Sequence, residues 1–268
     1  MQRHGPRHLR FAALGDSTTV GIGDPVEGGW RGWARLLCDA LATSYEVSYC
    51  NLSISGATAA SVHSDQLADA VAHRPDLASL IVGVNDTMRS TWDPVRMREQ
   101  LLECAAALDG AGAILLTVRF HDHGSVLGLP RWLRRPMFAR IERVNAIYDE
   151  MHATYGGLRV DLAQCPEIAT REFWSIDRLH PSELGHRALA RRYADLLAAR
   201  GLVCEPPSAQ REGGYVPDWR SDLRWMVTAG APWVGRRARD LGPWAVRMAL
   251  TEATAGRGPV VVEEVGVV

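Results

Sequence analysis

The chain contains no lysine, so all 30 of its basic residues are arginine, a bias that we attribute to coding preference rather than to function. The formal net charge is only −1, because 31 acidic residues balance the arginines. A chain so nearly neutral has no overall basic field to attract a polyanion, and we therefore expect no nucleic-acid partner.

Long apolar runs are missing as well. No stretch reaches the roughly 18 apolar residues that a transmembrane helix needs. The first ten residues, MQRHGPRHLR, lack the apolar segment of a signal peptide. We therefore expect no membrane span and a cytoplasmic location.

Metal-binding patterns are scarce. The cysteines are odd in number, scattered and never spaced as CxxC, which argues against a disulfide framework or a zinc site and predicts reduced thiols; they are Cys38, Cys50, Cys104, Cys165 and Cys204. His121 and His123 form a possible metal pair, but the sequence offers no evident third ligand and places them in a polar loop. We expect neither a metal nor another cofactor.

The composition is otherwise that of a soluble globular protein, with 47% hydrophobic and 23% charged residues in a chain of 268. Short apolar runs alternate with helical patterns over the first two hundred residues. Strands are predicted at 10–14, 45–52, 76–82, 114–118 and 158–162, and helices at 30–43, 61–73, 93–108, 138–154 and 181–200. This alternation predicts an α/β domain, residues 1–204, with a central parallel sheet covered on both faces.

The segment 205–268 differs in character. Residues 205–218 are rich in proline, glycine and charge, as a linker is. Residues 219–255 then give two amphipathic helical patterns that carry Trp219, Trp225, Trp233 and Trp244. We expect a helical C-terminal extension that packs on the main domain or on a second subunit, which would make the chain a homo-oligomer. A substrate-binding role is the alternative.

Ser17 is the candidate nucleophile. It follows the first predicted strand in the turn Gly15-Asp16-Ser17, and the carboxyl ends of parallel strands are where such sheets carry their working residues. Gly-Asp-Ser alone is a common turn, and the GxSxG elbow of α/β-hydrolases is absent. A serine hydroxyl also needs a base and donors for the oxyanion that its attack creates.

The base and the donors have candidates of their own. His180 precedes the last predicted helix, and Asp177, three residues upstream, is close enough to reach its Nδ1 and hold its tautomer. Asn85, at the end of the third strand, can donate its side-chain amide to an oxyanion. Gly56, after the second strand, can offer a backbone N–H. Each of these alone would be interpreted as a turn or a capping pair.

Taken in order, the four blocks resemble the SGNH, or GDSL, hydrolase family. They are Gly15-Asp16-Ser17, Gly56, Gly83-Val84-Asn85-Asp86 and Asp177-Arg178-Leu179-His180, and the resemblance covers roughly residues 10–200. It implies a three-layer flavodoxin-like sandwich. Most members of the family are esterases, lipases, thioesterases or carbohydrate deacetylases, and they need no metal.

Carried over residue by residue, the resemblance implies Ser17 as nucleophile, His180 as base and Asp177 as the partner of His180. The Ser17 and Gly56 N–H groups and the Asn85 side chain would form the oxyanion hole. We therefore expect a serine hydrolase of the esterase, lipase or deacetylase type that cleaves acyl esters through an acyl-serine intermediate, with a small-molecule acyl ester or thioester as its partner. Alternatives are an acyltransferase or thioesterase that uses the same triad, and a catalytically silent binding module.

An arginine-rich segment at 119–143 follows the strand 114–118 and should overhang the active edge. It carries six arginines against Asp122 and Glu142. One interpretation is a solvated loop followed by the start of a helix. The other is a lid that receives an anionic part of the substrate, such as a phosphopantetheine arm, with Arg131, Trp132 and Arg134 as candidate contacts.

Overall fold

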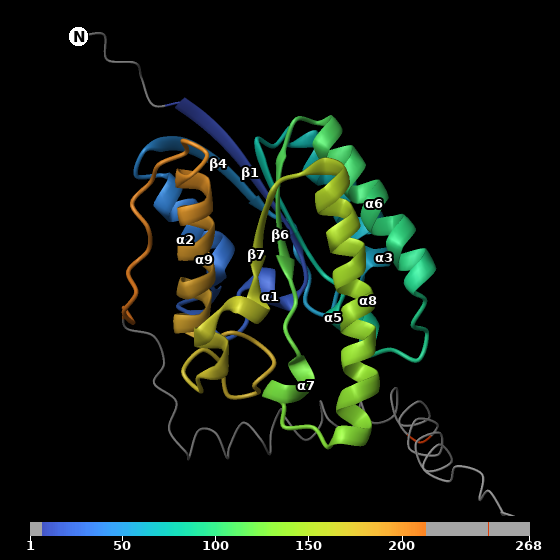
Figure 1. The fold of residues 1–268 in the computed structure, drawn as a ribbon. Coiled ribbons are helices and arrows are strands. Elements are labelled where there is room, and N and C mark those ends of the chain that lie inside the picture. Colours follow the sequence, from blue (N-terminus) through green and yellow to red (C-terminus); the bar gives the residue numbers. More distant parts are fainter. Residues whose placement is uncertain (1–6, 213–245, 247–268) are drawn as a thin grey trace, which may run out of the picture.

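The computed structural model describes residues 7–212 and residue 246 (Figure 1). The predicted helices within 219–255 and their four tryptophans lie outside the described residues. Within the described part, no helix is both long enough and apolar enough to cross a bilayer. All five cysteines are free, three of them buried and two partly buried.

A five-stranded sheet forms the centre of the molecule, and every neighbouring pair of its strands is parallel. The strands are β1 (Arg7–Gly15), β4 (Tyr45–Asn51), β5 (Leu77–Ile81), β6 (Ile114–Arg119) and β7 (Leu158–Asp161), in the order β4-β1-β5-β6-β7. Counted along the chain this is 2-1-3-4-5, the flavodoxin-like order. The prediction of an α/β fold with a parallel sheet is confirmed.

The strand order creates a switch point between β1 and β5. The chain leaves β1 toward β4 on one side and later continues from β5 toward β7 on the other. Loops that leave the carboxyl ends of two such neighbours diverge and open a crevice between them. Ser17 follows β1 and Asn85 follows β5, so the fold places both beside this crevice.

Helices cover both faces of the sheet (Figure 1). On one face, α2 (Gly32–Leu41) packs against α9 (Glu183–Ala198). On the other lie α3 (Ala59–Ser61), α4 (Leu67–Ala72), α6 (Pro94–Gly110) and α8 (Arg131–Tyr155). The sheet is therefore the middle layer of three, and its central strands are apolar on both sides; every residue of β5 is buried.

Several boundaries differ from the predictions for physical reasons. Residues Gly29–Trp30 (β3) pair with Pro25–Val26 (β2) in a small antiparallel ladder, so the helix predicted from 30 begins only at Gly32. The helix predicted at 61–73 is interrupted by a π-helical turn, Val62–Gln66, between α3 and α4. The short helices α1 (Ser17–Val20), α5 (Val84–Thr87) and α7 (His123–Val126) were not predicted.

The start predicted for α8 was wrong by seven residues. The helix begins at Arg131, directly after Pro130, and includes Pro136 in its second turn. A proline there removes one backbone hydrogen bond near the helix start without ending the helix. The second half of the arginine-rich segment is therefore helix, not loop.

The first residues of the predicted linker are held in place. Glu205 N donates to Thr43 Oγ1 at 3.1 Å, and the Arg191 guanidinium donates to the Pro207 carbonyl at 2.6 Å. The Arg187 guanidinium, buried on α9, is paired with Glu212 at 2.9 Å. Residues 205–212 thus pack along α9 and the end of α2 rather than standing away from the domain.

Candidate active site

Ser17 is the first residue of α1, immediately after β1, and it is 9% exposed. Asp16 caps this helix: its side chain accepts a hydrogen bond from Thr18 N at 3.0 Å. Because the first amides of a helix have no acceptor within the helix, the Ser17 N–H is available to another group. The strand-to-helix turn therefore presents the hydroxyl and the amide of the same residue at the sheet edge.

Gly15 makes this sharp turn possible. Its φ of +153° is strained for residues with a side chain, and a Cβ there would lie 2.5 Å from the Ile81 carbonyl oxygen. The buried side chain of Gln66 binds both backbone groups of Gly15: it accepts from Gly15 N at 2.9 Å and donates to Gly15 O at 3.0 Å. Gln66 ends the π-helical turn, so an irregularity of that helix positions the Ser17 loop.

His180 joins Ser17 to Asp177 through a chain of hydrogen bonds. His180 Nδ1 lies 2.6 Å from Asp177 Oδ2, and His180 Nε2 lies 2.7 Å from Ser17 Oγ. An ionised carboxylate only accepts, so Nδ1 carries the proton and Nε2 is the acceptor for the serine hydroxyl. The structure thus brings together all three residues that the sequence predicted for the triad.

The Asp177 carboxylate is held by more than the histidine. Its Oδ1 accepts from Ser175 Oγ at 2.6 Å, Leu179 N at 2.9 Å and His180 N at 3.0 Å. Burial on its own would raise the pKa of Asp177, but the hydrogen bonds and the charge of His180 outweigh it and lower that pKa to about 2. Asp177 is therefore ionised at neutral pH and fixed in its orientation.

The loop that carries His180 is closed on itself. Ser175 N donates to the His180 carbonyl at 2.9 Å, and Ser182 N donates to Phe173 O at 2.7 Å. Arg178, at its tip, has a left-handed φ of +53°. Loop closure leaves the imidazole little freedom to move relative to α9, whose N-cap is Ser182.

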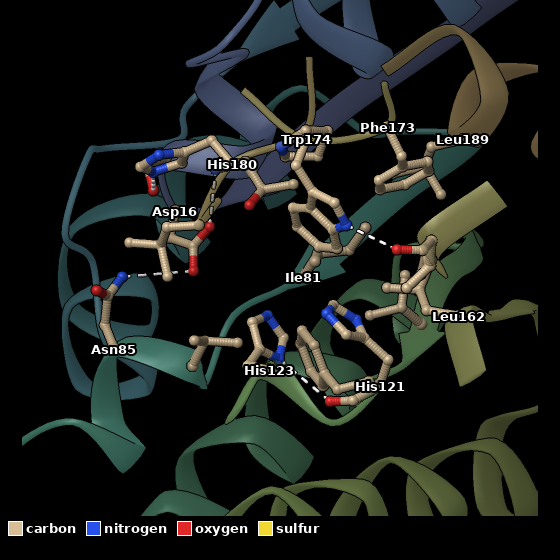
Figure 2. Close-up of a pocket in the computed structure, with 18 of the residues that line it drawn as sticks. Asp16, Ile81, Asn85, His121, His123, Leu162, Phe173, Trp174, His180 and Leu189 are labelled. Atoms are coloured by element: carbon tan, nitrogen blue, oxygen red, sulfur yellow. Dashed lines mark hydrogen bonds between the residues drawn. The ribbon is translucent and has the colours of Figure 1, made fainter. Parts of the chain in front are cut away.

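Asn85 lies in α5, 7% exposed, and its side-chain nitrogen donates to the Ala57 carbonyl at 3.1 Å and to Asp16 Oδ2 at 3.4 Å. The amide is therefore turned toward the Ser17 loop, as Figure 2 shows. Gly56 precedes Ala57 in a left-handed turn (φ +80°), and its carbonyl accepts from the Arg89 guanidinium at 3.1 Å. Gly56 does not line the adjoining cavity.

A small cavity adjoins Ser17, His180 and Asn85 (Figure 2). Its volume is about 50 Å³, measured as the space open to the centre of a water-sized sphere. Apart from polar groups of the Ser17 loop, Asn85, His180 and two further histidines, its lining is mostly apolar; the apolar part includes Ile81, Val84, Met88, Val118, Phe120, Leu162, Ile168, Phe173, Trp174, Leu179 and Leu189. These residues come from the carboxyl ends of three strands, from α5, and from α9 and the loops before it.

Sequence comparison matches residues 13–188, about two thirds of the chain, to the GDSL-like lipase/acylhydrolase family. The chain belongs to this family. No functionally curated protein shows significant similarity to it in sequence.

Several solved structures resemble the fold of the chain over most of their own length. A lipase/acylhydrolase from Enterococcus faecalis is 22% identical, with a TM-score of 0.57, and the match covers 75% of this chain and 100% of that one. The esterase EstA from Pseudoalteromonas sp., in a structure inhibited by monoethylphosphonate, is 16% identical (TM-score 0.57; 72% and 98% covered). A catalytic mutant of Axe2, an acetylxylan esterase from Geobacillus stearothermophilus, is 19% identical (TM-score 0.56; 75% and 97% covered).

Within this GDSL-family site, His121 and His123 are not in a polar loop, and that prediction was wrong. Both are buried, 5% and 6% exposed, because Phe120 and Trp174 pack around them. They line the cavity. In the described part of the chain, no group of three or more His, Cys, Asp or Glu side chains is arranged to hold a metal. Their position near the active site could have been predicted from the sequence, because they follow β6, whose carboxyl end lies at the active edge of the sheet.

Arg131, Trp132 and Arg134 do not line the cavity. They occupy the exposed first turn of α8, where Trp132 is 42% exposed and Arg134 pairs with Asp122 at 2.7 Å. The anionic-substrate role given to them stays a prediction. His186, by contrast, is fully buried and structural, since it accepts from Trp33 N at 3.2 Å through Nδ1 and donates to Ile22 O at 3.0 Å through Nε2.

Two carboxylates lie close to Asn85: buried Asp16, which its amide contacts, and partly buried Asp86, which follows it in the sequence. Burial raises the pKa of Asp16 to about 6, and burial, together with the nearby charge of Asp16, raises that of Asp86 to about 6 as well. Asp86 accepts from Ala59 N at 3.2 Å and so ties the start of α3 to the Asn85 turn. Both act on the shape of the Ser17 and Asn85 loops.

Proposed function

We propose that the chain is a serine esterase that hydrolyses short acyl esters through an acyl-enzyme formed on Ser17. The observation that carries this proposal is the continuous hydrogen-bond chain from Asp177 through His180 to Ser17 Oγ, beside a mostly apolar cavity. Membership of the GDSL-like lipase/acylhydrolase family supports it.

In the acylation step, Ser17 Oγ attacks the ester carbonyl carbon while its proton moves to His180 Nε2. The Asp177 carboxylate, held at 2.6 Å from Nδ1, stabilises the imidazolium that forms. The imidazolium then gives its proton to the alkoxide of the leaving alcohol as the tetrahedral intermediate collapses. In the second half, water loses a proton to His180 and attacks the acyl-serine, and the imidazolium then returns that proton to Ser17 Oγ as the bond between Oγ and the acyl carbon breaks and the acid leaves.

The developing oxyanion would be bound by the Ser17 N–H and the Asn85 side chain, which line the cavity; the family resemblance adds the Gly56 N–H, although Gly56 does not line it. Asn85 fits this role because its nitrogen already faces the Ser17 loop, and its long 3.4 Å contact with Asp16 is one that a substrate oxygen can replace. Its 3.1 Å bond to the Ala57 carbonyl keeps the amide in orientation meanwhile. Donors held in place before the reaction are what make such sites effective.

The relatives support this assignment of roles. In Axe2, an Asp and a His three positions apart were each replaced in structures described as catalytic mutants, and Asp177 and His180 have the same spacing. EstA was captured with a phosphonate inhibitor. The small cavity is consistent with an acyl chain of a few carbons, since one water needs roughly 10–15 Å³ by the same measure.

The test is hydrolysis of 4-nitrophenyl acetate and butyrate by wild type, Ser17→Ala, His180→Ala and the double variant. Each single variant should lose roughly 10³-fold or more in kcat, and the double variant hardly more, because the two residues act as a unit. Ser64→Ala, at an exposed serine on the π-helical turn, is the matched control and should be unchanged. Wild-type turnover by Ser17→Ala would reject the mechanism.

The alternatives make different products. An acyltransferase would transfer the acyl group to a second alcohol rather than to water. A thioesterase would cleave a thioester in preference to an oxygen ester. Product analysis of the same reactions, with glycerol added as a competing acceptor and acetyl-CoA as a competing substrate, separates them. A catalytically silent binding module would show no Ser17-dependent turnover at all.

A further inference from the structure

His121 is an unusual wall for an acyl cavity. It is only 5% exposed, and within the described part of the chain neither of its ring nitrogens has a hydrogen-bond partner. A neutral imidazole offers one donor and one acceptor, and buried polar groups in proteins are nearly always satisfied. The ring lines the cavity (Figure 2), and its two nitrogens are themselves buried, so a group that enters the cavity must press against this wall to reach them.

His123 adds a second polar edge with a defined tautomer. Its Nδ1 lies 3.2 Å from the His121 carbonyl oxygen, which can only accept, so Nδ1 carries the proton and Nε2 is an acceptor. The two rings are stacked, with centroids 4.0 Å apart and planes 24° apart. The pair therefore presents one donor and two acceptors.

Neighbouring contacts hold this pair rigidly. The side chain of Asn145, on α8, accepts from Phe120 N at 2.8 Å and donates to Phe120 O at 3.0 Å, which fixes the chain directly before His121. Trp174 packs against His121 with ring centroids 5.0 Å apart, and its indole donates to the Ile168 carbonyl at 2.7 Å. Groups immobilised in this way are suited to selecting a ligand.

The cavity thus has two polar ends with apolar walls between them. In Figure 2 the two histidines lie on the side of the cavity away from His180, with the Trp174 and Ile81 side chains between them and His180 in this view, and His123 lies between His121 and Asn85. An acyl chain whose carbonyl sits at Ser17 would run along the apolar walls toward the histidines. A purely aliphatic chain would leave the His121 ring nitrogens unsatisfied on binding.

We propose that His121 and His123 form a subsite that binds a hydroxyl group on a short acyl chain, so that the enzyme prefers hydroxyacyl esters over the corresponding alkanoyl esters. This inference rests on the proposed function, because it assigns the acyl group that Ser17 would accept. A hydroxyl both donates and accepts, which matches the one donor and the acceptors of the pair.

A charged acyl group fits less well. Burial, and then the neighbouring His123 ring, lower the pKa of His121 well below its ordinary value, and burial lowers the pKa of His123 to about 4. Both rings are therefore neutral at neutral pH and supply no countercharge for a carboxylate.

The hydroxyl belongs to the acyl part because the acyl group must stay in the site while the alcohol leaves and water enters.

The test compares kcat/KM for the 4-nitrophenyl esters of 3-hydroxybutyrate and butyrate, each corrected for its rate with hydroxide. Wild type should prefer the hydroxy ester by about tenfold, the effect of one well-made hydrogen bond. His121→Phe keeps a ring against Trp174 but removes both polar atoms, and should abolish the preference. His121→Gln, which restores a donor and an acceptor, should recover part of it.

His152→Phe is the matched control. His152 lies on α8, also has an unpartnered ring nitrogen, and does not line the cavity, so the preference should be unchanged. A second measurement needs no variant: the ring ¹⁵N resonances of His121 in wild type should shift with 3-hydroxybutyramide more than with butyramide. This keeps the inference testable if His121→Phe does not fold.

The outcomes of these experiments distinguish failure of the histidine subsite from failure of the proposed esterase function. Equal preference in wild type and His121→Phe, with Ser17-dependent turnover of both esters, would overturn the subsite and leave the esterase standing. Turnover that survives in Ser17→Ala would overturn both. A histidine-dependent preference seen only when the hydroxyl is moved to the alcohol part, as in ethylene glycol monoacetate against ethyl acetate, would overturn the assignment to the acyl side.

Discussion

Replacing Asp177 with asparagine changes one atom and should reverse the tautomer of His180. The asparagine oxygen can still accept from Leu179 N and His180 N, which bond to Oδ1 at 2.9 and 3.0 Å. Its amide nitrogen would then face His180 Nδ1, where Oδ2 now accepts at 2.6 Å. Two donors cannot share that contact, so the imidazole would move its proton to Nε2 and could no longer accept from Ser17.

The size of both effects follows from the structure. A histidine in the wrong tautomer cannot act as the base, and the expected loss in kcat is about 10⁴-fold. The pKa of Asp177 falls from an ordinary 3.8 to about 2, which is worth about 2–3 kcal/mol of folding stability at pH 7. Because the pKa is lowered, this stability is present above pH ~4 and lost as the pH falls through about 2.

The assay is kcat/KM on 4-nitrophenyl acetate together with the melting temperature at pH 7. Asp177→Asn should melt about 5–10 °C below wild type. Asp93→Asn is the matched control: Asp93 also accepts two backbone N–H groups, as the N-cap of α6, but lies outside the cavity. It should keep full activity. An Asp177→Asn variant within tenfold of wild-type kcat/KM would refute the role given to the carboxylate.

Three further predictions concern the surrounding loops. Asn85→Ala should lower kcat by about 10²–10³-fold with little change in KM, measured on the same ester, because its amide would bind the oxyanion only as charge develops. Asp86→Asn should raise stability by about 1–3 kcal/mol at pH 8 and by nothing below pH 4, since a carboxyl whose pKa is raised to about 6 loses stability as the pH rises through that value; melting curves across pH would show it. Gly15→Ala should cost about 2–4 kcal/mol in urea unfolding, because its Cβ would lie 2.5 Å from the Ile81 carbonyl oxygen.

The sheet could be predicted because its strands are either short apolar runs, as in β5, or alternate polar and apolar residues, as in β4. β5 is buried along its whole length, so its prediction did not depend on deciding which of its residues face the solvent. Helix starts were harder to predict. Pro136 lies inside α8 rather than before it, and the π-helical turn ending at Gln66 depends on the contact of Gln66 with Gly15, 51 residues away. Contacts between distant segments leave no local signal.

The same reasoning explains which site residues could be found. Asp177 and His180 are three residues apart, and Ser17 follows a strand, so the local pattern predicted their placement. The position of His121 after β6 indicated the active edge, but Asp122 and His123 beside it indicated a solvated loop rather than a buried wall. Its burial comes from Trp174, which packs on it from another part of the chain. The walls of the cavity are therefore the part of the site that sequence reasoning missed.

The central claim, an activated Ser17, is tested most directly by mass spectrometry of the intact protein after reaction with a fluorophosphonate probe. We expect a single adduct per chain, mapped by peptide analysis to Ser17, that forms rapidly in wild type, slowly in His180→Ala and not at all in Ser17→Ala. Esterase activity that persists without any adduct, or an adduct at a residue other than Ser17, would contradict it.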